Sequence, residues 1–301
     1  MRVLLTGASG YVGLHLAREL YDHGDELTAL VRSAEKLGPY AHAPGASVVL
    51  ADLEDEARVA SALEDHDVCV HAALLWGEPG TELEMRDTAV AAKLFDAAGR
   101  AGVSRCIYVS SVAVHRPFSR EMSEDDRVGA TDLYGATKAA GELVLRAACA
   151  EHGMTGIVVR PGPVVGAPAF PGASFRSDHR LEAMVGAGVE GRAIEVSDGE
   201  GRQLSDVAMV ARVVRRLARV DDPHPTYLCL EREPHTWEAI ARTVVAELGS
   251  GSEVRVLDRE AREPIPRFRT DRVDSLLGGP CDADAALIEH VRHLAYLHDR
   301  G

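Results

Sequence analysis

The chain has few cysteines, and they are scattered. Among 301 residues there are five, none of them in a Cys-x-x-Cys pair: Cys69, Cys106, Cys149, Cys229 and Cys281. An odd, scattered set of thiols suits the reducing cytoplasm, where we expect the protein to work. Cys69, Cys106 and Cys229 lie in apolar, strand-like runs, and we expect them to be buried and reduced.

Long apolar runs and an excess of positive charge are also missing. No apolar run reaches membrane-spanning length, and Gly7 and Gly10 come too early for a signal peptide. Lysine and arginine number 33 against 47 acidic residues, which gives a net charge of −14. This balance argues against general nucleic-acid binding, which needs basic patches, and against binding to an anionic membrane.

A complete set of metal ligands is missing as well. Of the 13 histidines, His290 and His293 are three residues apart in an expected C-terminal helix, and His298 is nearby. No carboxylate or cysteine completes a ligand set around them, so we expect no metal site.

A glycine-rich turn opens the chain. A short apolar strand is followed by Gly7-Ala-Ser-Gly10-Tyr11-Val12-Gly13, where a helical pattern begins. Strand, glycine turn and helix in this order predict a dinucleotide site. The glycines let the backbone approach the pyrophosphate, and the helix N-terminus favours its charge. Glycine turns also arise for steric reasons alone, but the position after a strand favours cofactor binding.

The ends of the next two expected strands bear on the choice of cofactor. The strand 26–31 ends at Arg32, where an NAD-binding protein would hold an acid for the ribose 2′-hydroxyl. Arginine suits the 2′-phosphate of NADP, so NADP(H) is favoured and NAD(H) remains possible. The strand 47–51 ends at Asp52, which could accept from the adenine amino group or cap the following helix.

A tyrosine, a lysine and a serine form the candidate catalytic centre. Tyr134 and Lys138 stand four residues apart in an expected helix, so both lie on one face. A nearby ammonium favours the phenolate, and the spacing therefore predicts a lowered pKa for Tyr134. Ser111 follows an apolar strand, at the end where open α/β sheets bind ligands. Each feature alone is common; their order along one βαβ series makes the combination informative.

Strands and helices alternate through about residue 160. The expected strands lie near 2–6, 26–31, 47–51, 67–72, 105–110 and 155–160, with the main helices at 11–22, 84–101 and 132–151. This alternation predicts an α/β fold with a doubly wound parallel Rossmann sheet. After Gly166 the pattern changes: helices are expected at 176–188, 206–219 and 237–248, the last capped by Thr236 and ended by Gly249.

The expected division is a dinucleotide-binding domain and a smaller C-terminal substrate-binding lobe. The dinucleotide-binding domain comprises residues 1–165, and residues 201–230 belong to it as well. The substrate-binding lobe comprises residues 166–200 and 231–301. The cleft between them is the expected substrate site.

The chain resembles the extended short-chain dehydrogenase/reductase superfamily of NAD(P)-dependent epimerases, dehydratases and reductases. The matching segments cover nearly the whole chain: 6–13, Asp52-Leu53, 70–73, 108–114, 134–138 with Gly141-Glu142, 160–166, 205–208 and 276–278. The resemblance implies that Tyr134 is the acid/base, that Lys138 holds the nicotinamide ribose and tunes Tyr134, and that Ser111 orients the substrate oxygen. Ser111 is preferred to Ser110 because it stands four residues before His115, where the family commonly has tyrosine.

The resemblance also implies further contacts. The expected cofactor-binding positions beyond the glycine turn are Arg32, Asp52, Leu53, Ala72, Ala73, Lys138, Pro161 and Val164. Helices 84–101 and 132–151 correspond to the pair that often forms a homodimer in the family.

Two positions depart from the family pattern and bear on the substrate. Asp87 stands where an asparagine is common, and Pro163 stands where sugar-nucleotide epimerases often have an asparagine. Proline offers neither a backbone donor nor a side-chain amide. The favoured function is therefore an NADP(H)-dependent oxidoreductase acting on the carbonyl or alcohol of a small molecule. The alternatives are an NAD-dependent nucleotide-sugar epimerase or dehydratase and, more remotely, a non-catalytic dinucleotide sensor.

Overall fold

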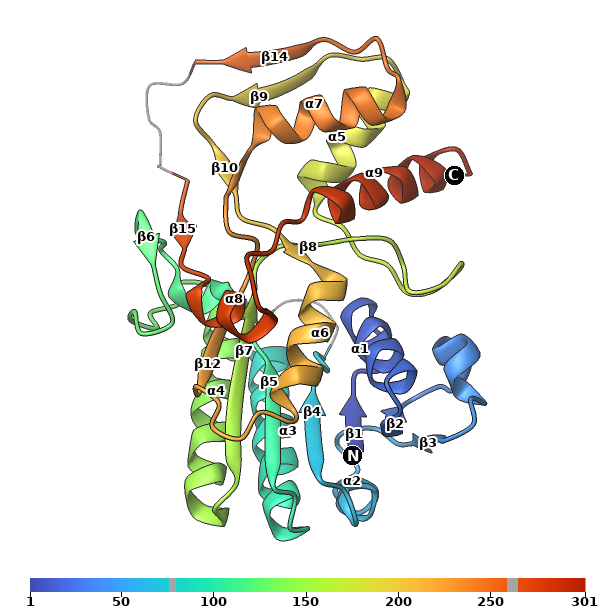
Figure 1. Ribbon diagram of the computed structural model, residues 1–301, viewed down its shortest axis with the longest axis vertical. Helices are drawn as coiled ribbons and strands as arrows, with labels where there is room; N and C mark the ends of the chain where they lie inside the picture. Colours follow the sequence, from blue (N-terminus) through green and yellow to red (C-terminus); the bar gives the residue numbers. More distant parts are fainter. Residues whose placement is uncertain (76–79, 259–264, 301) are drawn as a thin grey trace.

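The computed structural model describes residues 1–75, 80–258 and 265–300 (Figure 1). Its centre is a seven-stranded parallel sheet in the order β12-β7-β5-β4-β1-β2-β3. The strands are β1 (Arg2–Thr6), β2 (Glu26–Val31), β3 (Ala46–Leu50), β4 (Val68–His71), β5 (Arg105–Val109), β7 (Thr155–Pro161) and β12 (Thr226–Cys229). The expected α/β, doubly wound parallel sheet is confirmed.

The central strands are apolar throughout because helices cover both faces of the sheet. All four residues of β4 are buried, and so are the last four of β1. On one face pack α1 (Tyr11–Asp22) and α6 (Val207–Leu217). On the other pack α2 (Glu56–Leu63), α3 (Thr81–Arg100) and α4 (Leu133–His152).

A second apolar core stabilises the elements that Figure 1 shows above the sheet. It is built from α5 (His179–Val189), α7 (Trp237–Leu248), α9 (Asp284–His298) and the parallel pair β9 (Ile194–Ser197) and β14 (Val254–Leu257). Its residues come from the ranges expected for the smaller lobe, joined by Val165 and Leu204.

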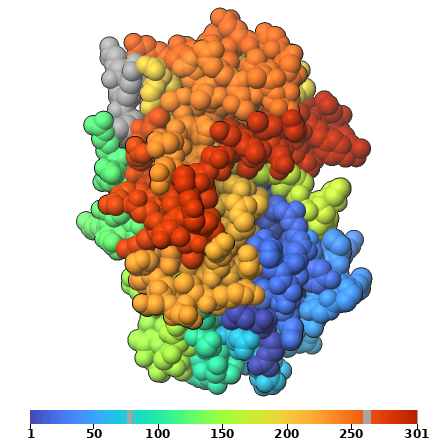
Figure 2. Space-filling model, viewed as in Figure 1, coloured from blue at the N-terminus to red at the C-terminus, as the bar shows by residue number. Residues whose placement is uncertain are grey.

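Short elements connect this upper part to the sheet. Three pairs of two-residue strands do so: β8 (Val164–Val165) with β11 (Ser205–Asp206), β10 (Gly201–Arg202) with β13 (His235–Thr236), and β6 (Glu121–Met122) with β15 (Arg267–Phe268). The remaining elements are η1 (Glu35–Ala41), η2 (Val112–His115) and α8 (Asp271–Leu277). In Figure 2 the C-terminal residues, in red, form a band between the orange upper part and the lower part of the molecule.

The ends of α7 and the start of α5 are set by their capping residues. The Thr236 hydroxyl accepts from the Ala239 N–H at 3.0 Å, and Gly249 ends α7 in the left-handed region, both as expected. The helix expected from residue 176 begins at His179, because Asp178 caps it by accepting from the Arg180 and Leu181 N–H groups. Within the described residues, no helix is both long and apolar enough to cross a membrane.

Candidate functional site

The candidate site lies at the carboxyl edge of the parallel sheet. The chain runs from β1 outward through β2 to β3, and then returns to β4 on the other side of β1. Ligands of open α/β sheets bind at such a reversal, outside the carboxyl ends of the strands. Gly7 follows β1 there, Ala72 follows β4, and Ser110 and Ser111 follow β5.

The glycine turn is a backbone cradle of the kind that a pyrophosphate requires. Gly7 has a φ of 73°, and a Cβ on it would lie 2.5 Å from the Ala73 nitrogen. A Cβ on Gly13 would lie 1.9 Å from the Gly7 oxygen, so glycine here lets α1 pack against the end of β1. Gly10 caps α1 without a side-chain hydrogen bond. The first N–H groups of the helix can therefore serve an anion.

The two candidate residues for the adenine end stand on neighbouring strands. Arg32 follows β2 and is exposed, and Asp52 lies beyond β3, whose strand pairs with β2. The Asp52 carboxylate accepts from the Glu54 N–H at 3.0 Å and does not cap α2. Asp55 caps that helix by accepting from the Arg58 N–H, so the capping role considered for Asp52 is wrong.

The two serines after β5 have different surroundings. The Ser110 hydroxyl is buried and donates to Glu142 Oε1 at 2.7 Å. Ser111 is 9% exposed, and its hydroxyl acts on Tyr134 by lowering the pKa of the phenol. It also accepts from the Ala113 N–H at 3.2 Å. Ser111, and not Ser110, is thus beside the tyrosine.

The first turn of α4 carries Tyr134 to this serine. Asp132 caps the helix by accepting from the Gly135 N–H at 2.9 Å, and Arg116 pairs with the same carboxylate at 2.8 Å. A Cβ on Gly135 would lie 2.6 Å from the Ala113 oxygen. Glycine at this position therefore allows α4 to approach the turn that follows Ser111.

The pKa of Tyr134 is raised, whereas the tyrosine–lysine spacing predicted that it would be lowered. The residue keeps 41% of its surface exposed, but its hydroxyl end is enclosed, and this desolvation is the largest effect. The Ser111 hydroxyl and the charges of Arg176 and Arg116 act in the opposite direction without overcoming it.

Lys138 is buried one helical turn below Tyr134. It is 4% exposed; its Nζ donates to the Val109 carbonyl at 3.1 Å and lies 4.9 Å from the centre of the Tyr108 ring. Burial lowers the pKa of Lys138 to about 8, although the charges of Asp87 and Glu142 raise it. The ammonium is therefore close to neutralisation at moderately alkaline pH.

Asp87 also belongs to this centre. It lies on α3, is 4% exposed, and accepts from the Leu75 N–H at 2.9 Å. Burial raises its pKa, and the Lys138 charge opposes that effect. The resemblance had singled out this position, and the charge of Asp87 raises the pKa values of Lys138 and Tyr134.

A buried ion pair between Glu142 and Arg160 lies next to Ser110, which donates to Glu142. Glu142 receives two hydrogen bonds from Arg160, at 2.8 and 2.6 Å, and both residues are 1% exposed. Arg160 also lies 2.9 Å from His115 Nε2. Because arginine can only donate, this nitrogen accepts, and Nδ1–H donates to the Arg127 carbonyl at 3.2 Å. Burial and the Arg160 charge lower the pKa of His115, which fits this neutral form.

The remaining predicted positions lie along the same edge. Ala72 and Ala73 pack on Gly7, and Leu53 is half-buried beyond β3. Pro161 ends β7, and Val164 begins β8. The Pro163 carbonyl accepts from the Ser205 N–H at 2.9 Å, so this backbone group already has a partner.

Sequence reasoning missed two charged residues near Tyr134. Arg116 precedes Pro117 in the loop after η2, and Arg176 lies in the long segment between β8 and α5. Both charges act on the tyrosine. Neither residue belongs to a periodic pattern or a motif, so only the three-dimensional arrangement reveals them.

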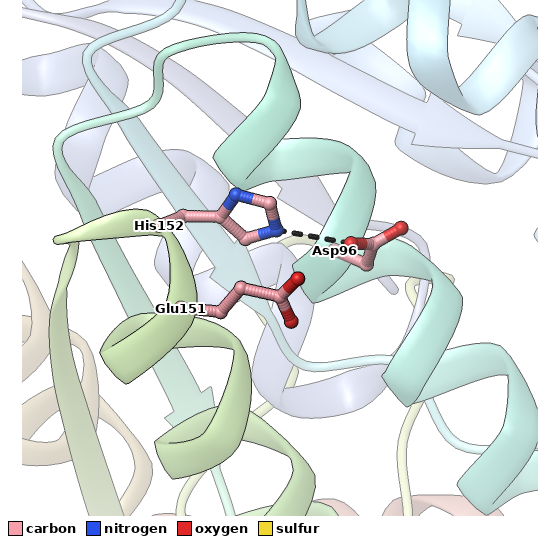
Figure 3. A group of neighbouring side chains, drawn as sticks. All are labelled: Asp96, Glu151 and His152. Carbon is pink, nitrogen blue, oxygen red and sulfur yellow. Dashed lines mark hydrogen bonds and ion pairs between the residues drawn. The ribbon is translucent and has the colours of Figure 1, made fainter.

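Two other groups of possible metal ligands have structural explanations. His290 is fully buried and bonded to Gly166 and Ser177. On α3 and α4, ligand atoms of Asp96, Glu151 and His152 lie within 4.8 Å of one another (Figure 3). Asp96 already pairs with His152 at 2.9 Å and Arg100 at 2.8 Å. These ion pairs account for the positions of Asp96 and His152.

Comparisons with known proteins agree with this geometry. The NAD dependent epimerase/dehydratase family matches residues 3–227. The 4-hydroxy-2-methyl-3-oxo-4-farnesyl-3,4-dihydroquinoline-1-oxide ketoreductase of Stigmatella aurantiaca is 35% identical over 178 residues, which are 56% of this chain and 51% of that protein. A dTDP-4-dehydro-6-deoxy-D-allose reductase of a Streptomyces species is 28% identical over 276 residues, covering 84% of this chain and 83% of the reductase.

Among solved structures, UDP-glucuronic acid 4-epimerase from Bacillus cereus, in complex with NAD, superposes with a TM-score of 0.84 at 17% identity. The match covers 99% of this chain and 100% of the epimerase, and it supports the fold. The chain spans about half the length of the first curated relatives that it matches. With the family matched over most of its length, this chain belongs to the NAD dependent epimerase/dehydratase family.

Proposed function

We propose that the protein is an NADP(H)-dependent oxidoreductase that reduces a ketone or aldehyde of a small molecule, or oxidises the corresponding alcohol. The observation that carries the proposal is the meeting of Ser111, Tyr134 and Lys138 at the carboxyl edge of the sheet, beside the glycine turn. When bound, a reduced nicotinamide supplies a hydride for the carbonyl carbon. The protein must then deliver a proton to the carbonyl oxygen.

Tyr134 is the proton donor in this proposal. Its raised pKa keeps the phenol protonated near neutral pH, which is the form that a reductase needs. Ser111 donates a hydrogen bond to the same substrate oxygen, and Lys138 holds the nicotinamide ribose. The substrate enters between the sheet and the upper lobe, near Arg116 and Arg176, whose charges already act on Tyr134.

The second candidate is a nucleotide-sugar epimerase or dehydratase that retains NAD. The segment after Gly166 favours this candidate, because hydrogen bonds hold it against the glycine turn and α1. Ser174 Oγ donates to the Ser9 carbonyl at 2.7 Å, and the Ala167 carbonyl lies 3.0 Å from His15 Nε2. A segment held in this position would slow cofactor exchange. An epimerase tolerates slow exchange because its cofactor is regenerated in every turnover.

Mass spectrometry and absorbance spectroscopy of the purified protein separate the two candidates. We expect an empty protein that binds added NADPH and consumes it when ketones or aldehydes are supplied. Retained NAD, with no consumption of NADPH by any carbonyl compound, would favour the epimerase.

The cofactor choice gives a prediction for Arg32. This exposed guanidinium at the end of β2 can form paired hydrogen bonds with a 2′-phosphate. We expect Arg32→Ala to weaken NADPH binding by roughly ten- to a hundredfold, because a charge-assisted bond is worth about 1.5–3 kcal/mol. NADH binding should change little.

Dissociation constants for both cofactors, measured by fluorescence titration on wild type and variant, test this prediction. Arg100→Ala, an exposed arginine at the far end of α3, is the control and should bind both cofactors as wild type does. Equal losses for NADPH and NADH in Arg32→Ala would mean that Arg32 stacks on the adenine instead.

We also propose that the protein forms a homodimer through α3 and α4. Apolar side chains on these two helices are exposed in the single chain: Met85 by 67%, Leu143 by 63% and Leu133 by 47%. We expect a dimer in sedimentation velocity at micromolar concentration, and we expect Leu143→Glu to shift it to monomer. A monomeric wild-type protein would refute the contact.

A further inference from the structure

The chain between β8 and α5 forms a loop without helix or strand, which lies between α1 and α9 (Figure 1). Residues 166–177 are called the 166–177 loop below. Residues 167–177 of this loop are half-buried or exposed, and none of them is buried. A segment with so little buried surface opens more easily than the helices and strands around it. Its side-chain contacts therefore decide how firmly it is held.

One face of α1 holds the outgoing half of the loop. Tyr11, His15 and Arg18 are at positions i, i+4 and i+7, so their side chains lie on one side of the helix. They contact, in the same order and at 2.7, 3.0 and 3.3 Å, the carbonyl oxygens of Gly166, Ala167 and Ala169. Because Arg18 also donates to His15 Nδ1, His15 donates to the loop from Nε2.

The tip of the loop packs on η1, and the returning half is bonded to the glycine turn. Phe170 lies against Gly38, where any Cβ would collide with its ring. The Ala173 N–H donates to the Phe170 carbonyl at 3.0 Å and closes the turn at the tip. The chain then comes back, and Ser174 Oγ donates to the Ser9 carbonyl at 2.7 Å.

The loop thus connects two parts of the candidate dinucleotide site. Ser9 belongs to the glycine turn, which can hold the pyrophosphate. The 3-10 helix η1 begins three residues after Arg32, the candidate partner of the 2′-phosphate. A dinucleotide that reaches from the glycine turn to Arg32 spans the same interval as the loop.

Both ends of the loop are attached to α9. His290 Nδ1 lies 3.2 Å from the Gly166 nitrogen, and His290 Nε2 lies 2.8 Å from Ser177 Oγ. The histidine itself is fully buried, so these two attachments are better protected than the contacts at the tip. The ends can therefore serve as hinges while the part from Ala167 to Ser174 moves.

We propose that the 166–177 loop is a gate for the dinucleotide: it opens by leaving Ser9 and η1, and its opening sets the rate of cofactor exchange. The inference rests on the proposed function in that the ligand is a dinucleotide. A reductase must exchange NADP⁺ for NADPH in every turnover, so the opening rate is then an upper limit on kcat.

Stopped-flow fluorescence of NADPH binding and release, without any carbonyl compound, tests the gate. In Ser174→Ala we expect both rate constants to rise about fivefold, the factor that corresponds to a hydrogen bond of about 1 kcal/mol. In Phe170→Ala both should rise as well. The dissociation constant should stay close to wild type, because the gate is loosened with and without the cofactor.

Hydrogen exchange of the backbone amides of residues 167–177, followed by mass spectrometry on the cofactor-free protein, reports the opening itself. It should accelerate in Ser174→Ala and in Phe170→Ala. Ser174→Thr keeps a hydroxyl and should behave as wild type. The control Ser104→Ala removes a bond of the same kind, from Ser104 Oγ to the Asp67 carbonyl at 2.8 Å, at the amino edge of the sheet. It should change neither measurement.

Cofactor rate constants at wild-type values in both variants, with faster hydrogen exchange in the loop, would overturn the gate. Unchanged hydrogen exchange in both variants would overturn it too, because these contacts would then not hold the loop closed. If Phe170→Ala folds poorly, Ser174→Ala decides alone. Loop-dependent cofactor exchange in a protein that reduces no carbonyl would instead overturn the proposed reductase and leave the gate supported.

Discussion

Replacing Tyr134 by phenylalanine should lower kcat for carbonyl reduction by roughly two to four powers of ten. The variant loses the hydroxyl on which Ser111 acts and which is proposed to donate the proton, but it keeps the ring. The glycine turn and Arg32 lie on other elements, so binding of NADPH should remain close to wild type. Steady-state kinetics and a fluorescence titration of NADPH measure the two effects.

A second variant separates loss of the proton donor from general damage at the start of α4. Leu133→Ala changes the neighbouring residue, which is 47% exposed, and should leave turnover close to wild type. Lys138→Met should reduce both turnover and NADPH affinity, because that residue is expected to act in both. Wild-type turnover in Tyr134→Phe would remove the tyrosine from the mechanism.

Acidification should unfold the protein between about pH 5.5 and pH 4. Burial is the main cause that lowers the pKa of three histidines from the ordinary value of 6.5: His71 to about 3, and His15 and His290 to about 4. The unfolded chain therefore binds these protons first, and stability present above pH 6.5 is lost as the pH falls toward 4. Each histidine contributes about 1.4 kcal/mol per pH unit in this window, which for three exhausts a typical domain stability.

Urea unfolding at a series of pH values, followed by circular dichroism, measures the slope of stability against pH. His290→Gln should make that slope shallower by about 1.4 kcal/mol per pH unit. His179→Gln removes a fully exposed histidine and should leave the slope unchanged. A free energy of unfolding that stays constant from neutral pH to about pH 5 would contradict the assignment of these histidines as buried and neutral.

Regular elements with strong local signals could be predicted from the sequence. The bounds of β1, β2 and α1 agree with the prediction residue for residue, since apolar runs and a glycine turn delimit them. The two-residue strands such as β8 and β11 could not be predicted, because tertiary pairing alone creates them. The capping role considered for Asp52 was wrong because a second acid, Asp55, stands directly before the same helix and caps it.

The candidate site could be predicted only in part, because its properties depend on tertiary packing. The i, i+4 spacing places Tyr134 and Lys138 on one helix face, but the effect of burial on their pKa values depends on the packed structure. That is why the expected lowering of the Tyr134 pKa was wrong. Arg176 lies far from the motif in sequence, and Asp87 was noticed only through the family resemblance.

The central claim is that this site reduces a carbonyl group with a proton from Tyr134. The most direct measurement incubates the purified protein with NADPH deuterated at nicotinamide C4 and a panel of ketones and aldehydes, with product analysis by mass spectrometry. The account predicts an alcohol that carries deuterium on the former carbonyl carbon with wild-type protein, and nearly none with Tyr134→Phe. Deuterated alcohol formed equally by both proteins, or by neither, would contradict it.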